Sequence, residues 1–230
     1  MENKPKKRGD RFDGYWLRDE VPAMNQFTAY LFPNRADNEA FIQQEIDLRP
    51  MDAFLAKKNA GLEKDRYSYF HVILAAMVKC FVLRPRMNRF IAGNRMYQRD
   101  HISVSFVVKK RFEDSSSEGL AYKRYTGDDT IDTLHASILE EIYQCRRTDV
   151  EDNSTAFMQK LVRLPRWLLR IVVNTLFRLD RKGKVPNALI RTDPNYSSIF
   201  LSNLGSIGLD ASYHHLNNWG TNSFFGVIGK

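Results

Sequence analysis

One serine and two histidines lie close together near the end of the sequence. Ser202 belongs to the segment SSIFLSNLGSIG, and His214 and His215 follow it in SYHHLNNWG. A serine hydroxyl can donate a hydrogen bond to a developing negative charge, and an imidazole titrates near neutral pH and can act as a general base. The structural alternative for Ser202 is a hydroxyl at a strand end that bonds a neighbouring backbone group. For the two histidines, the alternative is a structural role in the loop between two strands.

The remaining histidines are weaker candidates for chemistry. His71 lies in an apolar helical pattern, where a core residue with satisfied hydrogen bonds is expected. His135 lies on a helix with no neighbouring nucleophile, and His101 opens a strand at a polar turn. The sequence has no GxSxG, GxxxxGK[ST], GxGxxG or HExxH pattern, so it gives no support to a hydrolase triad, to a nucleotide site or to metal chemistry. We therefore expect no metal.

Composition limits the class of protein. The chain has 230 residues, 43% of them hydrophobic, and only two cysteines, Cys80 and Cys145, which stand in no CxxC or Cys/His cluster. This usage predicts neither a disulfide framework nor a zinc site, and it favours a reducing, cytoplasmic location. Residues 1–14 are polar and basic and predict a flexible arm. Residues 15–230 predict a single domain.

The net charge of +8 raises the question of nucleic acid. The basic residues form local clusters at 4–11, 109–111 and 178–184, none of them within a helix-turn-helix, zinc-finger or RNP-like pattern. We expect solvated faces and no specific nucleic-acid partner. Binding of a ligand that carries phosphates is a further explanation of the positive net charge.

The most apolar helical stretch, residues 161–179, is interrupted by four arginines. Each arginine at the centre of a bilayer would cost about 2.5–3.5 kcal/mol, which argues against a transmembrane span. No apolar core of signal-peptide length follows the basic N-terminus. The sequence therefore predicts no membrane partner.

Periodicity predicts helices interleaved with strands. Apolar side chains recur at three- and four-residue spacing over residues 70–81, with Ser68 as N-cap and Pro85 after the end. Residues 101–112 alternate like a long strand, and Asn94 marks a turn before them. The other predicted elements are a strand at 38–48, a helix from Asp52 to Asn59, a strand at 120–125, a helix capped by Thr130 or Asp132, two helices within 152–179 separated near Pro165, and strands at 198–204 and 223–228. This order predicts an α/β (α+β) fold, a two-layer mixed sheet with helices packed on it.

The order of these segments resembles the chloramphenicol acetyltransferase-like family, which includes the dihydrolipoyl acyltransferase catalytic domains of 2-oxo acid dehydrogenase complexes. The matching pieces are the IDL segment with its following helix, FHVILAAMVK, RPRMNRFIAGNRMYQR, SVSFVVKKRF and SNLGSIG. They cover most of the chain from about residue 30. The chain has no lipoyl-type domain, so the resemblance is to stand-alone members, without a lipoyl attachment.

The resemblance implies an acyltransferase that uses coenzyme A or acyl-coenzyme A as co-substrate. The acceptor would be a small molecule, with either a hydroxyl or a dihydrolipoyl thiol, and the assembly a homotrimer. Ser202 occupies the position of the serine or threonine that donates a hydrogen bond to the oxyanion. The family's general base is a histidine in an HxxxDG motif, which this sequence lacks.

The only substitute for that motif is HHLNNWG, in which His215 is the candidate base and Trp219 stands in place of the aspartate. We therefore expect a C-terminally incomplete domain that stops before HxxxDG and has impaired activity. The alternative is a non-catalytic relative that acts as an oligomeric assembly or ligand-binding module.

Overall fold

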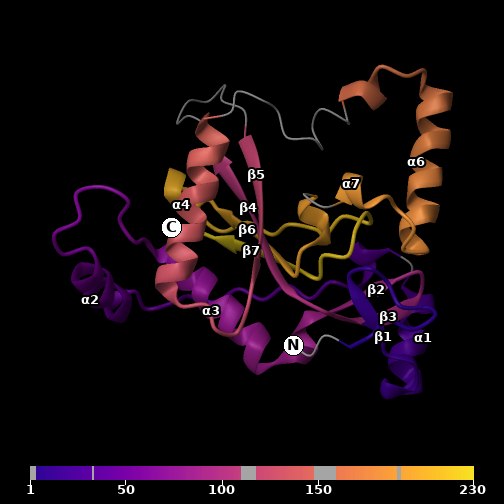
Figure 1. Cartoon of the computed structure of the whole chain (residues 1–230), viewed down its shortest axis with the longest axis horizontal. Helices are drawn as coiled ribbons and strands as arrows, with labels where there is room; N and C mark the ends of the chain where they lie inside the picture. The colour runs from indigo at the N-terminus through magenta and orange to yellow at the C-terminus, as the bar shows by residue number, and fades with distance from the viewer. Residues whose placement is uncertain (1–3, 33, 110–117, 148–158, 191–192) are drawn as a thin grey trace.

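The computed structural model describes residues 4–32, 34–109, 118–147, 159–190 and 193–230. A four-stranded mixed sheet in the order β5-β4-β6-β7 forms its centre (Figure 1). β4 (Ile102–Lys109) pairs antiparallel with β5 (Glu118–Tyr125) and parallel with β6 (Ile199–Asn203). β6 in turn pairs parallel with β7 (Phe224–Ile228). The α/β class predicted from the sequence is confirmed.

Two helices cover one face of this sheet, α3 (Tyr69–Leu83) and α4 (Ile131–Arg147). Alternate residues of β4 point toward them, because successive side chains of a strand point to opposite faces. These residues and their partners form the main core: Leu74, Val78, Phe81, Ile102, Val104, Phe106, Val108, Leu134, Ile138, Ile199 and Leu201. The predicted caps are confirmed, since Ser68 forms a capping box with His71 and Thr130 Oγ1 accepts a hydrogen bond from Thr133 N at 3.3 Å.

A second, three-stranded sheet lies beside the first, in the order β1-β3-β2. Its strands are β1 (Gly14–Trp16), β2 (Arg89–Ala92) and β3 (Arg95–Arg99), all antiparallel. The β2-β3 hairpin turns at Gly93 and Asn94, which both have positive φ, 56° and 61°. A two-residue hairpin turn of this type needs positive φ at both positions, and this explains the Gly-Asn pair.

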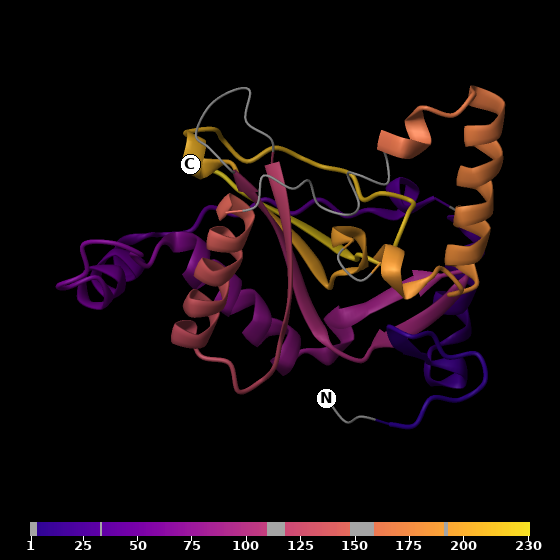
Figure 2. The same cartoon turned by 45° about the horizontal axis from the view of Figure 1, so that its top comes forward.

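The remaining elements surround these sheets. The other α-helices are α1 (Ala23–Leu31), α2 (Arg49–Lys58), α6 (Arg166–Arg181) and α7 (Asn187–Ile190). Short 3-10 helices lie at Arg18–Glu20, Arg35–Asn38, Pro85–Asn88, Pro194–Tyr196 and Gly205–Ile207. In both views α2 and α6 extend from opposite ends of the molecule (Figures 1 and 2).

One predicted element is wrong, and a second, the helix predicted from Asp52 to Asn59, is present with a different start. Residues 38–48 form no strand, because Arg35–Asn38 is a 3-10 helix and residues 39–48 have no regular structure. No described strand pairs with this segment, and its side chains Ile42 and Ile46 are exposed. The next helix, α2, begins at Arg49 rather than after Asp52, and the carboxylate of Asp52 accepts a hydrogen bond from the Tyr69 hydroxyl instead.

The last two strands and the break at Pro165 are confirmed where the structure describes them. α6 begins directly after Pro165, which is its N-cap residue, and one helical turn at residues 159–162 precedes it. The part of the predicted helical region at 152–158 lies outside the described residues. Within the predicted N-terminal arm, residues 4–8 are exposed, whereas Arg11 and Asp13 are buried.

Candidate functional site

Ser202 lies on the face of the central sheet opposite α3 and α4. Its neighbours Ile199 and Leu201 point into the core beneath the helices, so Phe200 and Ser202 point the other way. Ser202 pairs in register with Val227 of β7 and is half-buried. Among the described residues its hydroxyl has no hydrogen-bond partner. It can therefore donate to a bound group without breaking an existing bond.

The residues that follow Ser202 have structural roles. Asn203 Oδ1 accepts a hydrogen bond from Ser206 N at 3.2 Å, and the Asn203 carbonyl accepts one from Ser206 Oγ at 2.7 Å. A Cβ at Gly205 would lie 2.5 Å from the carbonyl oxygen of Gly229, a distance that excludes any side chain there. Asn203 and Gly205 thus form the turn and leave the side chain of Ser202 available.

His214 is the histidine that the structure brings to the face carrying Ser202. Its ring stacks on Phe225, with centroids 3.9 Å apart, and Phe225 stacks on Phe200 at 4.8 Å. Phe200 precedes Ser202 by two residues on the same face of the sheet, a separation of about 6.6 Å along a strand. The Nδ1 atom of His214 lies 2.7 Å from the carbonyl oxygen of His215. A proton on Nδ1 would donate to that carbonyl and leave Nε2 as the basic nitrogen.

His215, the base candidate from the sequence, points elsewhere. Its Nδ1 lies 2.7 Å from Glu39 Oε2, and its side chain is 69% exposed. Glu39 Oε1 also accepts a hydrogen bond from Leu216 N at 2.5 Å, so this carboxylate joins the 39–43 segment to the histidine loop. Trp219, which stands where the motif has an aspartate, donates from Nε1 to Asp193 Oδ2 at 2.6 Å. The HHLNNWG pattern is thus explained by contacts that hold the loop.

A cavity of about 650 Å³ lies beside the histidine loop. His214, Glu39 and Phe225 line it, together with cationic and apolar side chains from distant parts of the chain. The other lining residues that matter here are Arg35, Arg89, Arg181, Phe32, Phe41 and Ile42. Ser202 does not line this cavity. The combination of arginines and apolar side chains suits an elongated ligand with an anionic group and an apolar part.

A buried ionic cluster adjoins the cavity at Asp180, which lines it. Arg11 Nε donates to Asp13 Oδ1 at 2.9 Å, and Arg11 Nη2 lies 3.5 Å from Asp180 Oδ1. The Tyr196 hydroxyl donates to the same oxygen of Asp180 at 2.6 Å. Burial raises the pKa of Asp180, and burial together with this carboxylate raises the pKa of Tyr196. No local sequence pattern indicates this cluster, because its members lie far apart along the chain.

Two further arginines hold the loop that contains Gly220. Arg99 is fully buried and donates to the Thr221 carbonyl at 2.6 Å and to the Tyr196 carbonyl at 3.0 Å. Arg35 donates to the carbonyls of Gly220 and Asn222. Burial, with the nearby Arg99, lowers the pKa of Arg35 to about 10, so it stays charged at neutral pH.

Sequence reasoning missed a hydrogen-bonded chain at the start of β4. His101 Nδ1 lies 2.5 Å from Asp100 Oδ1, and its Nε2 lies 3.2 Å from the Tyr122 hydroxyl. Burial works to raise the pKa of Asp100, but hydrogen bonds from His101 and Lys6 outweigh it and lower the pKa to about 2. The adjacent Asp-His pair before a strand was the available signal. Neither described cavity reaches these residues.

His71 and His135 are core residues, but the expectation that His71 has satisfied hydrogen bonds is wrong for one of its nitrogens. The Nε2 atoms of both rings are buried and have no hydrogen-bond partner among the described residues. Both residues are buried, and their rings lie 4.8 Å apart between α3 and α4. Within the described part of the chain, no group of three or more His, Cys, Asp or Glu side chains has the arrangement of a metal site. Over the same residues, no helix has the length and apolar character needed to cross a membrane.

Comparison with known proteins places the fold. No family model matches the chain, and no curated protein matches it. The chain is similar to the truncated catalytic core of the 2-oxoacid dehydrogenase multienzyme complex from Thermoplasma acidophilum, with 11% identity and a TM-score of 0.53, over 91% of this chain and 78% of that one. It is also similar to the dihydrolipoamide acetyltransferase of Azotobacter vinelandii, with 16% identity and a TM-score of 0.49, over 94% of this chain and 68% of that one.

A third similar structure is a probable dihydrolipoamide acetyltransferase from Listeria monocytogenes, with 12% identity and a TM-score of 0.49, over 95% of this chain and 70% of that one. At these identities the likeness concerns the fold alone, and the Thermoplasma core carries it. The chain has the fold of an acyltransferase catalytic core, as the sequence resemblance predicted.

Proposed function

We propose that this chain is an acyltransferase domain that moves an acyl group between coenzyme A and a small hydroxyl or dihydrolipoyl thiol acceptor. The observation that carries the proposal is the hydroxyl of Ser202, which has no hydrogen-bond partner in the described part of the chain and lies at the end of a parallel strand in an acyltransferase-core fold. A tetrahedral intermediate of acyl transfer develops an oxyanion, which such a hydroxyl can stabilise.

The cavity residues fit a coenzyme A thioester. Arg89 and Arg181 offer cations for phosphate groups, and Phe41 and Ile42 offer apolar surface for the rest of the ligand. Bound coenzyme A would supply the acyl group as a thioester. Ser202 lies outside the cavity, so the thioester end of the ligand would have to extend from the cavity past Phe225 and Phe200. There Ser202 would donate to the carbonyl oxygen as it gains charge. The homotrimer and the cytoplasmic location belong to the same proposal.

The general base is the weak part of the site. His215 binds Glu39 at the exposed rim, whereas His214 lies over the Ser202 face, and none of the described residues forms a hydrogen bond with its Nε2. Neither histidine contacts Ser202, and the sequence has no HxxxDG motif. We therefore expect slow turnover that depends on oxyanion stabilisation and ligand binding. In a serine protease that lacks its base, these two effects still accelerate the reaction by about 10³–10⁴-fold over the rate in water.

A thiol-release assay with acetyl-coenzyme A tests the proposal. The chain should release thiol above the uncatalysed rate, and Ser202→Ala should lower kcat by about 10²-fold, because a single oxyanion donor is worth about 10²–10³-fold. Ser212→Ala, an exposed serine on the following loop, is the matched control and should leave the rate unchanged. Equal rates for the wild type and Ser202→Ala would refute the role of Ser202.

A second candidate is a non-catalytic assembly or ligand-binding module. The observation that favours it is the cavity of about 650 Å³ beside a histidine loop whose side chains are engaged in structural contacts. Calorimetry discriminates the two. Coenzyme A binding without thiol release at any pH would support the module and exclude the enzyme.

A further inference from the structure

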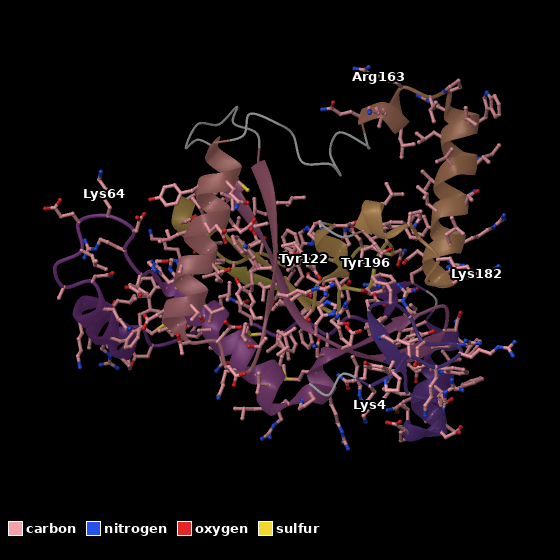
Figure 3. All side chains as sticks on the ribbon, viewed as in Figure 1. Lys4, Lys64, Tyr122, Arg163, Lys182 and Tyr196 are labelled. Carbon is pink, nitrogen blue, oxygen red and sulfur yellow. The ribbon has the colours of Figure 1, made fainter. Side chains whose placement is uncertain are left out.

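α6 projects from the molecule (Figures 1 and 2), and the contacts that the described residues show for it with other elements lie at its C-terminal end. At that end the ring centroids of Phe177 and Trp219 lie 5.7 Å apart, and Asp180 belongs to the buried ionic cluster. Leu179 packs against the small core of Val185, Ile190 and Tyr196. The opposite end and the turn before it reach furthest from the sheets, as the position of Arg163 shows (Figure 3).

The outer end of this projection, residues 160–171, combines exposed apolar and basic side chains. We call it the α6 tip. Val162 is 72% exposed, Trp167 67% and Ile171 55%. The tip has four exposed basic residues, Lys160, Arg163, Arg166 and Arg170. The sequence has no acidic residue between 159 and 179, so the tip is uniformly cationic.

Trp167 and Ile171 are four residues apart, so they lie on one side of α6 with Arg166 and Arg170 nearby, and Val162 belongs to the turn before the helix. An exposed apolar pair of this kind is costly to leave in water. Large exposed apolar side chains that cluster together mark an interaction surface. The arginines that argue against a membrane span do not argue against an interfacial position, because there the guanidinium groups remain among lipid headgroups. Tryptophan is also the residue type enriched at membrane interfaces.

We propose that the α6 tip docks on an anionic lipid surface, with Val162, Trp167 and Ile171 at the headgroup boundary. The charge of the tip selects this occupant. A second copy of this chain would bring the same four cations against each other in a symmetric contact, whereas an anionic bilayer complements them. The expectation of no membrane partner rested on the arguments against a membrane span and against a signal peptide, and neither argument covers this geometry.

Sedimentation with lipid vesicles tests the docking surface. The wild-type chain should sediment with vesicles of phosphatidylcholine mixed with phosphatidylglycerol, and not with phosphatidylcholine alone. Arg166→Gln/Arg170→Gln should weaken binding by about 25-fold, because each basic residue near such a surface contributes about fivefold. Trp167→Ala should weaken it by at least about fivefold through lost apolar burial.

Matched variants separate the tip from general charge. Arg84→Gln/Arg86→Gln removes two exposed arginines from another part of the molecule, and Leu83→Ala removes an exposed apolar side chain there. Both should bind vesicles as the wild type does. Circular dichroism should show the same folded content in all variants, since every substituted side chain is exposed.

Three results would overturn the proposal. The first is failure of the wild-type chain to bind anionic vesicles. The second is an equal loss in Arg84→Gln/Arg86→Gln and Arg166→Gln/Arg170→Gln, which would indicate a diffuse charge effect. The third is a change of molar mass in solution caused by Trp167→Ala without vesicle binding, which would make the tip a contact between copies. None of these results depends on acyl transfer.

Discussion

The hydroxyl of Ser202 has no hydrogen-bond partner among the described residues, while the side chain of the next residue, Asn203, holds the turn that follows. The SNLG sequence does not show which side chain bonds the turn and which has no partner, because serine and asparagine both form hydrogen bonds with local backbone readily. Alternation along β6 does place Ser202 opposite the buried Leu201, and the sequence could show that much. The side chain of His214 could not be placed from the sequence, since it depends on contacts with Phe225 of a different element.

The buried ion pairs of Arg11 give a first prediction. Arg11→Met should lower the free energy of unfolding by about 3–5 kcal/mol, because it leaves Asp13 and Asp180 without their cation in a buried site. Urea denaturation measures this loss. Arg49→Met, which breaks the exposed pair with Asp47, is the control and should cause no measurable change. If both variants changed the free energy of unfolding by similar amounts, the buried ion pairs would not stabilise the fold more than the exposed one, and the prediction would be wrong.

The burial of His71 gives a second prediction. Burial and the neighbouring His135 lower the pKa of His71 to about 4, from an ordinary value of 6.5. The unfolded chain therefore binds a proton more readily, and stability should fall as pH drops from 6.5 toward 4. The loss from this group should reach about 2–3 kcal/mol at pH 4.5.

His71→Gln isolates that effect, because glutamine can keep the capping-box hydrogen bond and does not titrate. Denaturation curves at pH 7.5 and 4.5 should show a smaller drop in stability for the variant than for the wild type. The other titrating groups are common to both proteins and cancel in the comparison. If the wild type and His71→Gln lost the same stability between pH 7.5 and 4.5, protonation of His71 would not contribute to the acid destabilisation.

At the scale of elements, local pattern predicted the helices better than the strands. α3 and α4 follow from apolar spacing and a capping residue, both of which are local signals. The segment 38–48 has apolar residues typical of a strand, but a strand also needs a partner strand. The residues of the segment alone do not determine whether it has one. The parallel β6-β7 pair depends on the loop between its strands, which returns the chain to the start of the sheet.

Gly220 lies in that loop and gives a third prediction. It has φ +86°, and a Cβ there would lie 2.3 Å from the carbonyl oxygen of Asn195. Gly220→Ala should destabilise the protein by more than about 2 kcal/mol, since steric overlap adds to a backbone strain of about 1–2 kcal/mol.

Gly61→Ala provides the comparison, because Gly61 has φ +79° and open space around it. It should show only the backbone strain, about 1–2 kcal/mol. Thermal unfolding of both variants measures the difference. Equal losses would mean that the Gly220 loop adjusts freely and does not fix the approach to β7.

At the scale of the whole molecule, the mixed sheet, its helical cover and the acyltransferase-core fold were predictable from the order of the segments. The ionic cluster and the cavity were not, because they are assembled from residues far apart in the sequence: Arg11 with Asp180 in the cluster, and Arg35 with Arg181 in the cavity. Such sites arise from packing between elements, and no local pattern encodes them. The sequence also did not predict that α6 extends away from the sheets, since its pattern resembles that of a helix packed on the core.

In the proposed reaction, the hydroxyl of Ser202 stabilises the oxyanion during acyl transfer. The most direct measurement is kcat for thiol release from acetyl-coenzyme A by the wild type, Ser202→Ala and Ser202→Thr. Threonine keeps the hydroxyl, so Ser202→Thr should stay within about tenfold of the wild type, whereas Ser202→Ala should fall by about 10²-fold. Equal losses in the two variants would show that the size of the side chain matters and its hydroxyl does not, and would contradict the account.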